Sequence, residues 1–156
     1  MRISLAADHG GFDLKNSIVS YLMSKHYEVI DLGTFSSESV DYPDFALKAV
    51  ESILMKEADR AIIMCGSGIG ISITANRFPG IRAALCWDPF TAKLSRLHND
   101  ANILAMGGRL IGVELAKEIV DTWLSTDFEG GRHERRIAKI DEYAKNFWKK
   151  YMEGEK

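Results

Sequence analysis

Five short, mostly apolar segments alternate with helical patterns along the chain, and this alternation restricts the fold more than any other feature. The segments span residues 2–7, 28–33, 60–65, 81–87 and 101–106. Their apolar residues tend to follow one another directly, which is typical of parallel strands buried on both faces. Between the segments, apolar residues recur three and four positions apart, as they do in helices that cover a sheet. The order predicts an α/β fold with a three-layer, doubly wound, five-stranded parallel sheet of the Rossmann-like type.

The segment after the fifth strand-helix unit has a different pattern. A glycine-broken connection leads into a last helical stretch, whose apolar positions fall three and four apart. The chain of 156 residues suits a single domain. We therefore expect one domain over 1–156, with an α/β core over 1–128 and a C-terminal helical arm over 129–156.

Composition and charge exclude several classes of protein. The net charge of −2 gives no overall basicity for binding nucleic acid or an anionic membrane. No apolar run approaches the roughly 18 residues of a membrane span, and the N-terminus lacks the apolar core of a signal peptide. Two cysteines without an export signal are expected to stay reduced. We expect a cytoplasmic protein that binds neither nucleic acid nor membrane.

The sequence CGSGIG at 65–70 places a thiol before three glycines at the end of the third apolar segment. A strand that turns into a helix through such a loop directs backbone N–H groups at one spot, which suits an anion. A tight structural turn is the alternative. The dinucleotide fingerprint has Ile71 where it needs its third glycine, although Asp88 lies near the distance of a ribose-binding acid. The loop also lacks the lysine of a Walker motif and the arginine of a cysteine phosphatase.

Cys65 stands where the thiolate form is favoured, before a helix N-terminus. A thiolate there acts as a nucleophile or as a base; a small buried side chain is the alternative. Cys86 is expected to be such a buried side chain, and an oxidised pair with Cys65 is a minor alternative.

Three of the four histidines lie in polar stretches that we expect to form loops: DHGG, LHND and GRHERR. None has the spacing of a metal site, so no metal is expected. In the last stretch, Arg132 and Arg136 share one helix face. Their charges suit an external phosphate; ion pairs with Glu129, Glu134 or Asp141 are the alternative.

Together the glycine loop and the arginines offer two anion sites. A phosphorylated small molecule would place its phosphate on the arginines and a developing charge on the loop. With a base nearby, these parts suit an aldose–ketose isomerase that works through an enediolate.

Several motifs in the same order resemble the ribose-5-phosphate isomerase B family, which also contains galactose-6-phosphate and allose-6-phosphate isomerases. They are AADHGG, CGSGIGISITANRFPGIRAALC, SRLHNDANILAMGGRLIG and FEGGRHERRI, and the likeness runs from about residue 2 to 141. The resemblance implies an isomerase that interconverts D-ribose 5-phosphate and D-ribulose 5-phosphate in the pentose phosphate pathway. It also implies a cis-enediolate and no metal or cofactor.

The resemblance further implies roles for matched residues. Cys65 would be the base, Ser67 would assist proton movement between two substrate oxygens, and His98 would help open the furanose ring. The other matched residues would bind substrate through the anion hole, the sugar contacts or the phosphate contacts: Asp8, His9, Tyr42, Gly66, Gly68, Ile69, Gly70, Asn99, Arg109, Arg132, His133 and Arg136.

Family members form homodimers or homotetramers whose sites are shared between subunits, so the resemblance implies that the arm packs on a partner subunit. Two alternatives stay open at this point. One is a hexose-6-phosphate isomerase of the same family, and the other is a nucleotide-binding module without catalytic activity.

Overall fold

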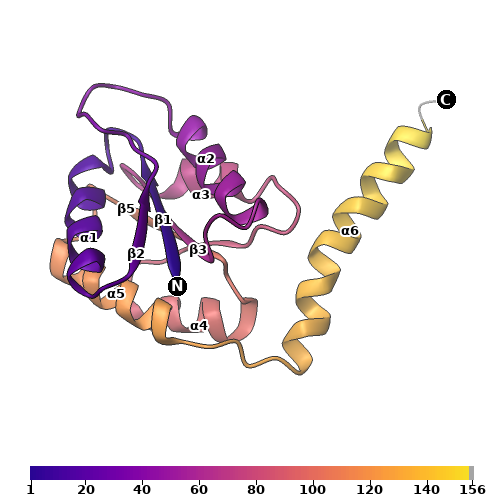
Figure 1. Ribbon diagram of the computed structural model, residues 1–156. Coiled ribbons are helices and arrows are strands. Elements are labelled where there is room, and N and C mark those ends of the chain that lie inside the picture. Colours follow the sequence, from indigo (N-terminus) through magenta and orange to yellow (C-terminus); the bar gives the residue numbers. More distant parts are fainter. Residues whose placement is uncertain (155–156) are drawn as a thin grey trace.

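The computed structural model describes residues 1–154 and contains a central sheet with helices on both sides (Figure 1). Strands and helices alternate along the chain until two helices follow one another at the end. The elements are β1 (Arg2–Ala7), α1 (Phe12–Ser24), β2 (Glu28–Asp31), α2 (Tyr42–Leu54), β3 (Arg60–Cys65), α3 (Ile69–Ala75), β4 (Ala83–Leu85), α4 (Pro89–Asn99), β5 (Ile103–Gly107), α5 (Val113–Ser125) and α6 (Arg132–Gly154).

The sheet has five strands in the order β2-β1-β3-β5-β4, and every pairing is parallel. Strand side chains alternate between two cores. Ile3 and Leu5 of β1 face a core completed by α1, α4 and α5, whereas Ala6 faces a core completed by α2 and α3. The mostly apolar strands therefore reflect burial on both faces, and the predicted three-layer fold is confirmed.

The two edge strands are shorter than predicted. β2 ends at Asp31 instead of residue 33, and Gly33 has a positive φ of 90°, which lies outside the strand conformation. β4 has only three residues instead of seven. Each of these strands pairs with a single neighbour, so fewer ladder hydrogen bonds hold it in register.

A buried ion pair fixes the chain where β1 and β2 end. Lys15 Nζ is fully buried and donates to both carboxylate oxygens of Asp31 at 2.7 Å. Asp31 Oδ1 also accepts from the N–H of Gly33, whose carbonyl accepts from the N–H of Ala7 at 2.7 Å. The residue after Ala7 is Asp8, so this network positions the first polar residue at the carboxyl edge of the sheet.

The two cysteines are free thiols that lie on opposite faces of the sheet. β5 lies between β3 and β4, so the segments that carry Cys65 and Cys86 are not neighbours. The alternative of an oxidised Cys65–Cys86 pair is therefore wrong for this fold. Burial raises the pKa of the Cys86 thiol, as expected for a small buried side chain.

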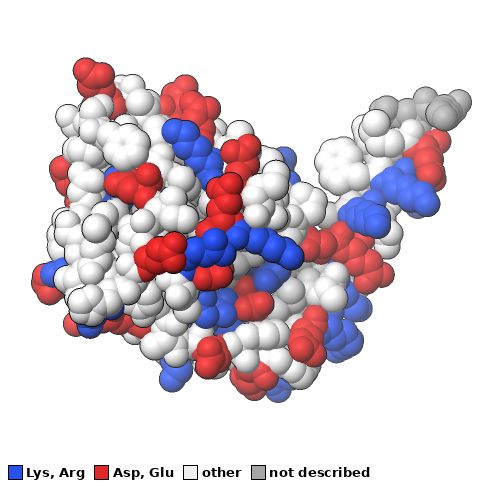
Figure 2. All heavy atoms as spheres, in the orientation of Figure 1, with Lys and Arg blue, Asp and Glu red and all other residues white. Residues whose placement is uncertain are grey.

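Helix α6 projects from the body of the protein (Figures 1 and 2). Its apolar positions stay solvent-exposed in the single chain, as at Ile140 (52%), Phe147 (63%) and Trp148 (58%). An amphipathic helix gains most of its stability from burying such a stripe. The division into a core over 1–128 and an arm over 129–156 stays a prediction.

Charges of both signs are interspersed over the face shown in Figure 2. Within the described part of the chain, no helix combines the length and the apolarity needed to cross a membrane.

Candidate active site

A cavity of about 410 Å³ opens at the carboxyl edge of the sheet, where ligands bind in doubly wound folds. It collects side chains from the loops after β1, β3 and β5 and from the start of α2. The lining residues are Asp8, Tyr42, Cys65, Gly66, Ser67, Gly70, Arg109 and Leu110. Seven of these eight are predicted site residues, so sequence reasoning identified most of this cavity.

Cys65 is the last residue of β3, and its thiol accepts a hydrogen bond from a backbone N–H. The donor is Gly68, and the N–S distance is 3.1 Å. The side chain is largely buried but lines the cavity. The Gly68 N–H therefore holds the Cys65 sulfur in place at the wall of the cavity.

The loop after Cys65 requires glycine at two positions. Gly68 has a φ of 78°, and a Cβ there would lie 2.6 Å from Leu85 Cδ1. A Cβ on Gly70 would lie 2.7 Å from the Tyr42 ring. Glycine thus lets the loop turn sharply and lets the Tyr42 ring lie directly against the first turn of α3.

Several N–H groups of this loop converge near the cavity. Gly68 donates to Cys65 Sγ, and Ile69 donates to Ser67 Oγ at 3.2 Å. Within residues 1–154, no hydrogen bond is found for the N–H of Ser67, and Gly70 stands in the first helical turn, where a helix supplies no acceptor of its own. Ser67 and Gly70, together with Gly66, whose N–H also has no hydrogen bond within residues 1–154, are therefore donors that suit a bound oxyanion.

Asp8 and His9 follow β1 and are both anchored by the backbone. Asp8 Oδ1 accepts from the N–H groups of Gly10 and Gly11, at 2.8 and 3.2 Å, which fixes its carboxylate at the cavity. His9 Nδ1 lies 3.3 Å from both the nitrogen and the oxygen of Val40. Both residues stand at the predicted edge of the sheet.

Arg109 follows β5 and lies over the glycine loop. Its backbone N–H donates to the Gly66 carbonyl, and a Cβ on Gly66 would lie 3.4 Å from the Arg109 side chain. No ion pair of Arg109 is found among the described residues. A guanidinium exposed at the cavity in this way is suited to an anionic group of a ligand.

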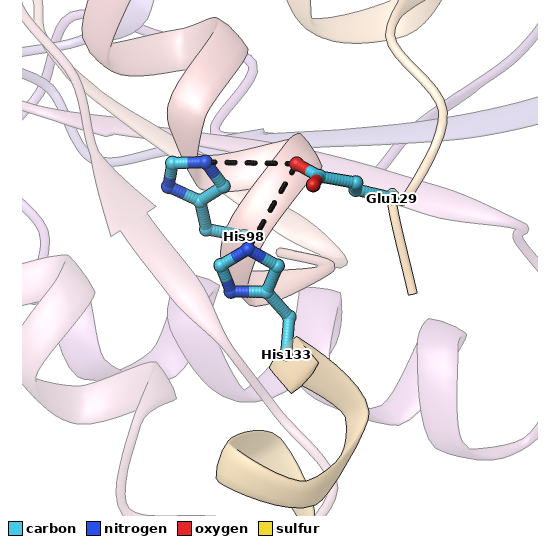
Figure 3. A group of neighbouring side chains, drawn as sticks. All are labelled: His98, Glu129 and His133. Carbon is cyan, nitrogen blue, oxygen red and sulfur yellow. Dashed lines mark ion pairs between the residues drawn. The ribbon is translucent and has the colours of Figure 1, made fainter. Parts of the chain in front are cut away.

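The remaining predicted side chains form a second group around His98 and His133. A smaller cavity of about 240 Å³ is lined by His98, Asn99, His133, Arg136, Ile137 and Ile140. The imidazoles of His98 and His133 stack with centroids 4.4 Å apart and planes inclined by 12°. The Nε2 atoms of both rings lie 3.8 Å from Oε2 of Glu129 (Figure 3). Burial, followed by the neighbouring charge of His98, lowers the pKa of His133.

Arg132 and Arg136 of the GRHERR stretch have no carboxylate partner in the described part of the chain. Arg132 donates from Nε to His133 Nε2 at 3.5 Å, and within residues 1–154 no ion pair joins Arg132 or Arg136 to an acid. Glu129 contacts the histidines instead, and Asp141 accepts from the backbone of Gly80. The alternative of internal ion pairs is therefore wrong, and both guanidinium groups are available to an external anion.

The two groups of side chains lie at opposite ends of the strands: the first at their carboxyl ends and the second at their amino ends. Helix α4 begins after β4 and runs back to the amino edge, where the side chain of Arg82, next to the start of β4, donates to the Asn99 carbonyl at 2.8 Å. Cys65 ends β3 at the carboxyl edge. A single chain therefore does not bring His98 to Cys65. His98 and His133 also lie in the end turns of helices and not in the predicted loops.

A family model described as "Ribose/Galactose Isomerase" matches residues 3–140, which is most of the chain. The chain belongs to this family. Ribose-5-phosphate isomerase B of Escherichia coli is 51% identical over 139 residues, which cover 89% of this chain and 93% of that protein.

Two solved structures of the family share the fold. The structure of ribose-5-phosphate isomerase B from Clostridium thermocellum has a TM-score of 0.93 and 54% identity, and the match covers 94% of this chain and 99% of that one. The ribose 5-phosphate isomerase of Thermotoga maritima has a TM-score of 0.90 and 62% identity, with 90% and 97% covered.

Asp88 has a structural role in this protein, and that role argues against the dinucleotide-binding alternative. Asp88 caps α4: its Oδ1 accepts from the N–H of Thr91 at 2.8 Å, and its Oδ2 accepts from the Thr91 hydroxyl at 3.1 Å. The Thr91 N–H lowers the pKa of the Asp88 carboxyl. Asp88 is thus a helix cap, and its distance from the glycine loop does not indicate a ribose-binding acid.

The sequence did not predict three of the residues that line the two cavities. Leu110 lines the first cavity, and its only signal is its place directly after Arg109. Ile137 and Ile140 line the second cavity, and their only signal in the sequence is their place on the apolar stripe of the last helix.

Proposed function

We propose that the chain is an aldose–ketose isomerase that interconverts D-ribose 5-phosphate and D-ribulose 5-phosphate. One observation carries the proposal: Cys65 presents a thiol, hydrogen-bonded by Gly68, to a cavity that also holds Arg109. The relative from Escherichia coli that bears the name ribose-5-phosphate isomerase B is about half identical over nearly its full length. The reaction needs a base, a stabilised oxyanion and a phosphate anchor.

In the proposed mechanism, the Cys65 thiolate removes the proton from C2 of the open-chain aldose. The electron pair of the broken C–H bond enters a cis-enediolate, whose negative charge is stabilised by N–H groups of the loop from Gly66 to Gly70. The Ser67 hydroxyl moves a proton from O2 to O1, and the Cys65 thiol returns its proton to C1. These steps yield the ketose and restore the thiolate without a metal or a cofactor.

The proposal assigns ring opening to His98 and phosphate binding to cationic side chains from both edges of the sheet. Asp8, Tyr42 and Asn99 contact the sugar hydroxyl groups. The phosphate is held by His9, Arg109, Arg132, His133 and Arg136. Arg109, Arg132 and Arg136 form no ion pair with an acid among residues 1–154, which supports this assignment because guanidinium pairs well with phosphate.

Because His98 and Cys65 lie at opposite edges, the proposal requires a second copy of the chain. In a homodimer, the group around His98 and His133 of one subunit would complete the cavity around Cys65 of its partner. Helix α6 would bury its exposed apolar side chains against the partner subunit. A homotetramer would pair two such dimers. The proposed setting is the cytoplasm, in the pentose phosphate pathway.

The test is isomerisation by the purified protein with three substrates: ribose 5-phosphate, allose 6-phosphate and galactose 6-phosphate. We expect rapid ketose formation from the pentose and a loss of at least about 10²-fold in kcat for Cys65→Ala, the lower range for losing an acid–base group. Cys86→Ala is the matched control and should keep its activity. Turnover of a hexose phosphate alone would change the substrate, and full activity of Cys65→Ala would refute the mechanism.

A further inference from the structure

Three side chains from separate segments converge between α4 and α6. His98 lies in the last turn of α4, Glu129 in the connection after α5, and His133 in the first turn of α6. Figure 3 shows both imidazoles directed at the same carboxylate. One potential ligand atom from each residue lies within 4.8 Å of the other two.

The geometry is close to that of a coordinated ion. Zinc bonds of about 2.0–2.2 Å in a tetrahedral site place neighbouring ligand atoms about 3.4 Å apart. Each imidazole Nε2 is 3.8 Å from Glu129 Oε2, so these two distances need to shorten by only a few tenths of an ångström. The imidazole planes are inclined by only 12°, so the rings must also turn out of their stack to direct both Nε2 lone pairs at one ion. The Glu129 side chain is 53% exposed and can make that movement without repacking a core.

We propose that His98, Glu129 and His133 bind a divalent transition-metal ion such as Zn²⁺, and that the bound ion inhibits the enzyme. Inhibition rests on the proposed function, because the ion would occupy the imidazole assigned to ring opening. It would also block the place where the partner's cavity is completed.

The ligand set selects the class of ion. Two imidazoles and one carboxylate suit Zn²⁺, Co²⁺, Ni²⁺ or Cu²⁺, whereas Mg²⁺ and Ca²⁺ prefer sites made of oxygen alone. The second cavity borders both histidines and leaves room for a water molecule as a fourth ligand. Three protein ligands with an open position differ from a closed structural zinc site, and the proposed ion is exchangeable.

Neighbouring charges oppose tight binding. Arg132 donates to His133 Nε2 at 3.5 Å, and that long contact must break before the nitrogen can coordinate an ion. Arg132 and Arg136 also repel a dication, while Glu129 attracts it. Glu129 is therefore the ligand to substitute in a test, because the proposed isomerisation assigns it no step.

The first test measures binding without reference to activity. The intact protein is stripped with a chelator and dialysed, and Zn²⁺ affinity is then measured by competition with a chromophoric chelator. We expect one ion per chain, and a loss of at least about tenfold in affinity for Glu129→Gln, since even a supporting contact to a ligand contributes that much. Glu134→Gln, an exposed acid next to His133 in the first turn of α6, is the matched control and should bind as the unmodified protein does.

Cys65 is a competing thiol ligand and needs its own control. Cys65→Ala should keep the zinc site, and Co²⁺ bound to the unmodified protein should show no thiolate charge-transfer band. Equal zinc affinity of Glu129→Gln and the unmodified protein, or loss of binding in Cys65→Ala, would overturn the proposal.

The second test measures inhibition. Each variant is titrated with Zn²⁺ during ribose 5-phosphate isomerisation, and the concentration that halves its own zinc-free rate is compared. Glu129→Gln should need at least about ten times more Zn²⁺, and Mg²⁺ should not inhibit either protein. An unchanged inhibitory concentration would refute the regulatory claim. A protein without isomerase activity would refute the proposed function and leave the binding test to decide the metal site.

Discussion

The separation of Cys65 from His98 leads to a prediction about mixtures of inactive variants. Cys65→Ala removes the base from the first cavity, and His98→Asn removes the ring-opening group from the second. Each variant alone should be nearly inactive, because every composite site in its homodimer lacks one group. A mixed dimer should differ, since its two sites carry unequal numbers of substitutions.

The magnitude follows from the placement of the two groups at opposite edges of the sheet. In a mixed dimer, one site combines both substitutions and the other combines two intact groups. Random exchange of equal amounts makes half of the dimers mixed, and each of these has one intact site out of two. The mixture should therefore recover about a quarter of the activity of the unmodified protein.

The assay mixes the two variants, dissociates and reassociates the subunits, and follows ketose formation per total chain. Cys65→Ala with Arg109→Ala is the control pair, because both residues belong to the first cavity and each site of the mixed dimer stays damaged. Recovery in the first mixture alone supports shared sites. A mixture that never exceeds the activity of its parents would refute the shared site.

Three further predictions concern individual side chains. Gly70→Ala places a Cβ 2.7 Å from the Tyr42 ring, so we expect about 1–3 kcal/mol of lost stability and a higher KM, measured by denaturant unfolding and kinetics; unchanged values would contradict the packing. Asp88→Ala should cost about 1 kcal/mol through the lost helix cap and leave kcat unchanged, and loss of activity at full stability would argue for a role in ligand binding. The pKa of His133 lies below its ordinary value of 6.5, so as the pH falls the unfolded chain binds a proton at this imidazole before the folded chain does, and the free energy of unfolding should decrease below pH 6.5. His133→Gln should make the decrease in stability between pH 8 and 5 smaller in thermal unfolding. The same decrease in the variant and the unmodified protein would refute this prediction.

Most of the fold was predictable because burial on both sheet faces leaves a direct mark on sequence. The mostly apolar strands and the helical spacing between them fixed the three layers. The strand order was less accessible: β5 inserts between β3 and β4, and no residue pattern in either segment encodes which strand is its neighbour. The minor alternative of an oxidised Cys65–Cys86 pair is wrong for this reason.

The first cavity was largely predictable because a parallel sheet gathers the loops that follow its strands at one edge. Asp8, Cys65 and Arg109 each come directly after a strand, and the structure brings them together. His98 does not follow a strand, and its place at the other edge depends on the length of α4, which runs to Asn99. Its contact with Glu129 and His133 is tertiary, so spacing along the chain carried no sign of it.

The most direct test of the account is the path of the proton during turnover in deuterated water. If the Cys65 thiol carries the proton between C2 and C1 through an enediolate, deuterium should enter C1 of ribulose 5-phosphate as the proton on sulfur exchanges with solvent. Cys65→Ala should still bind the sugar phosphate while both turnover and deuterium entry disappear. Turnover or deuterium entry at an unchanged rate in Cys65→Ala would contradict the central claim.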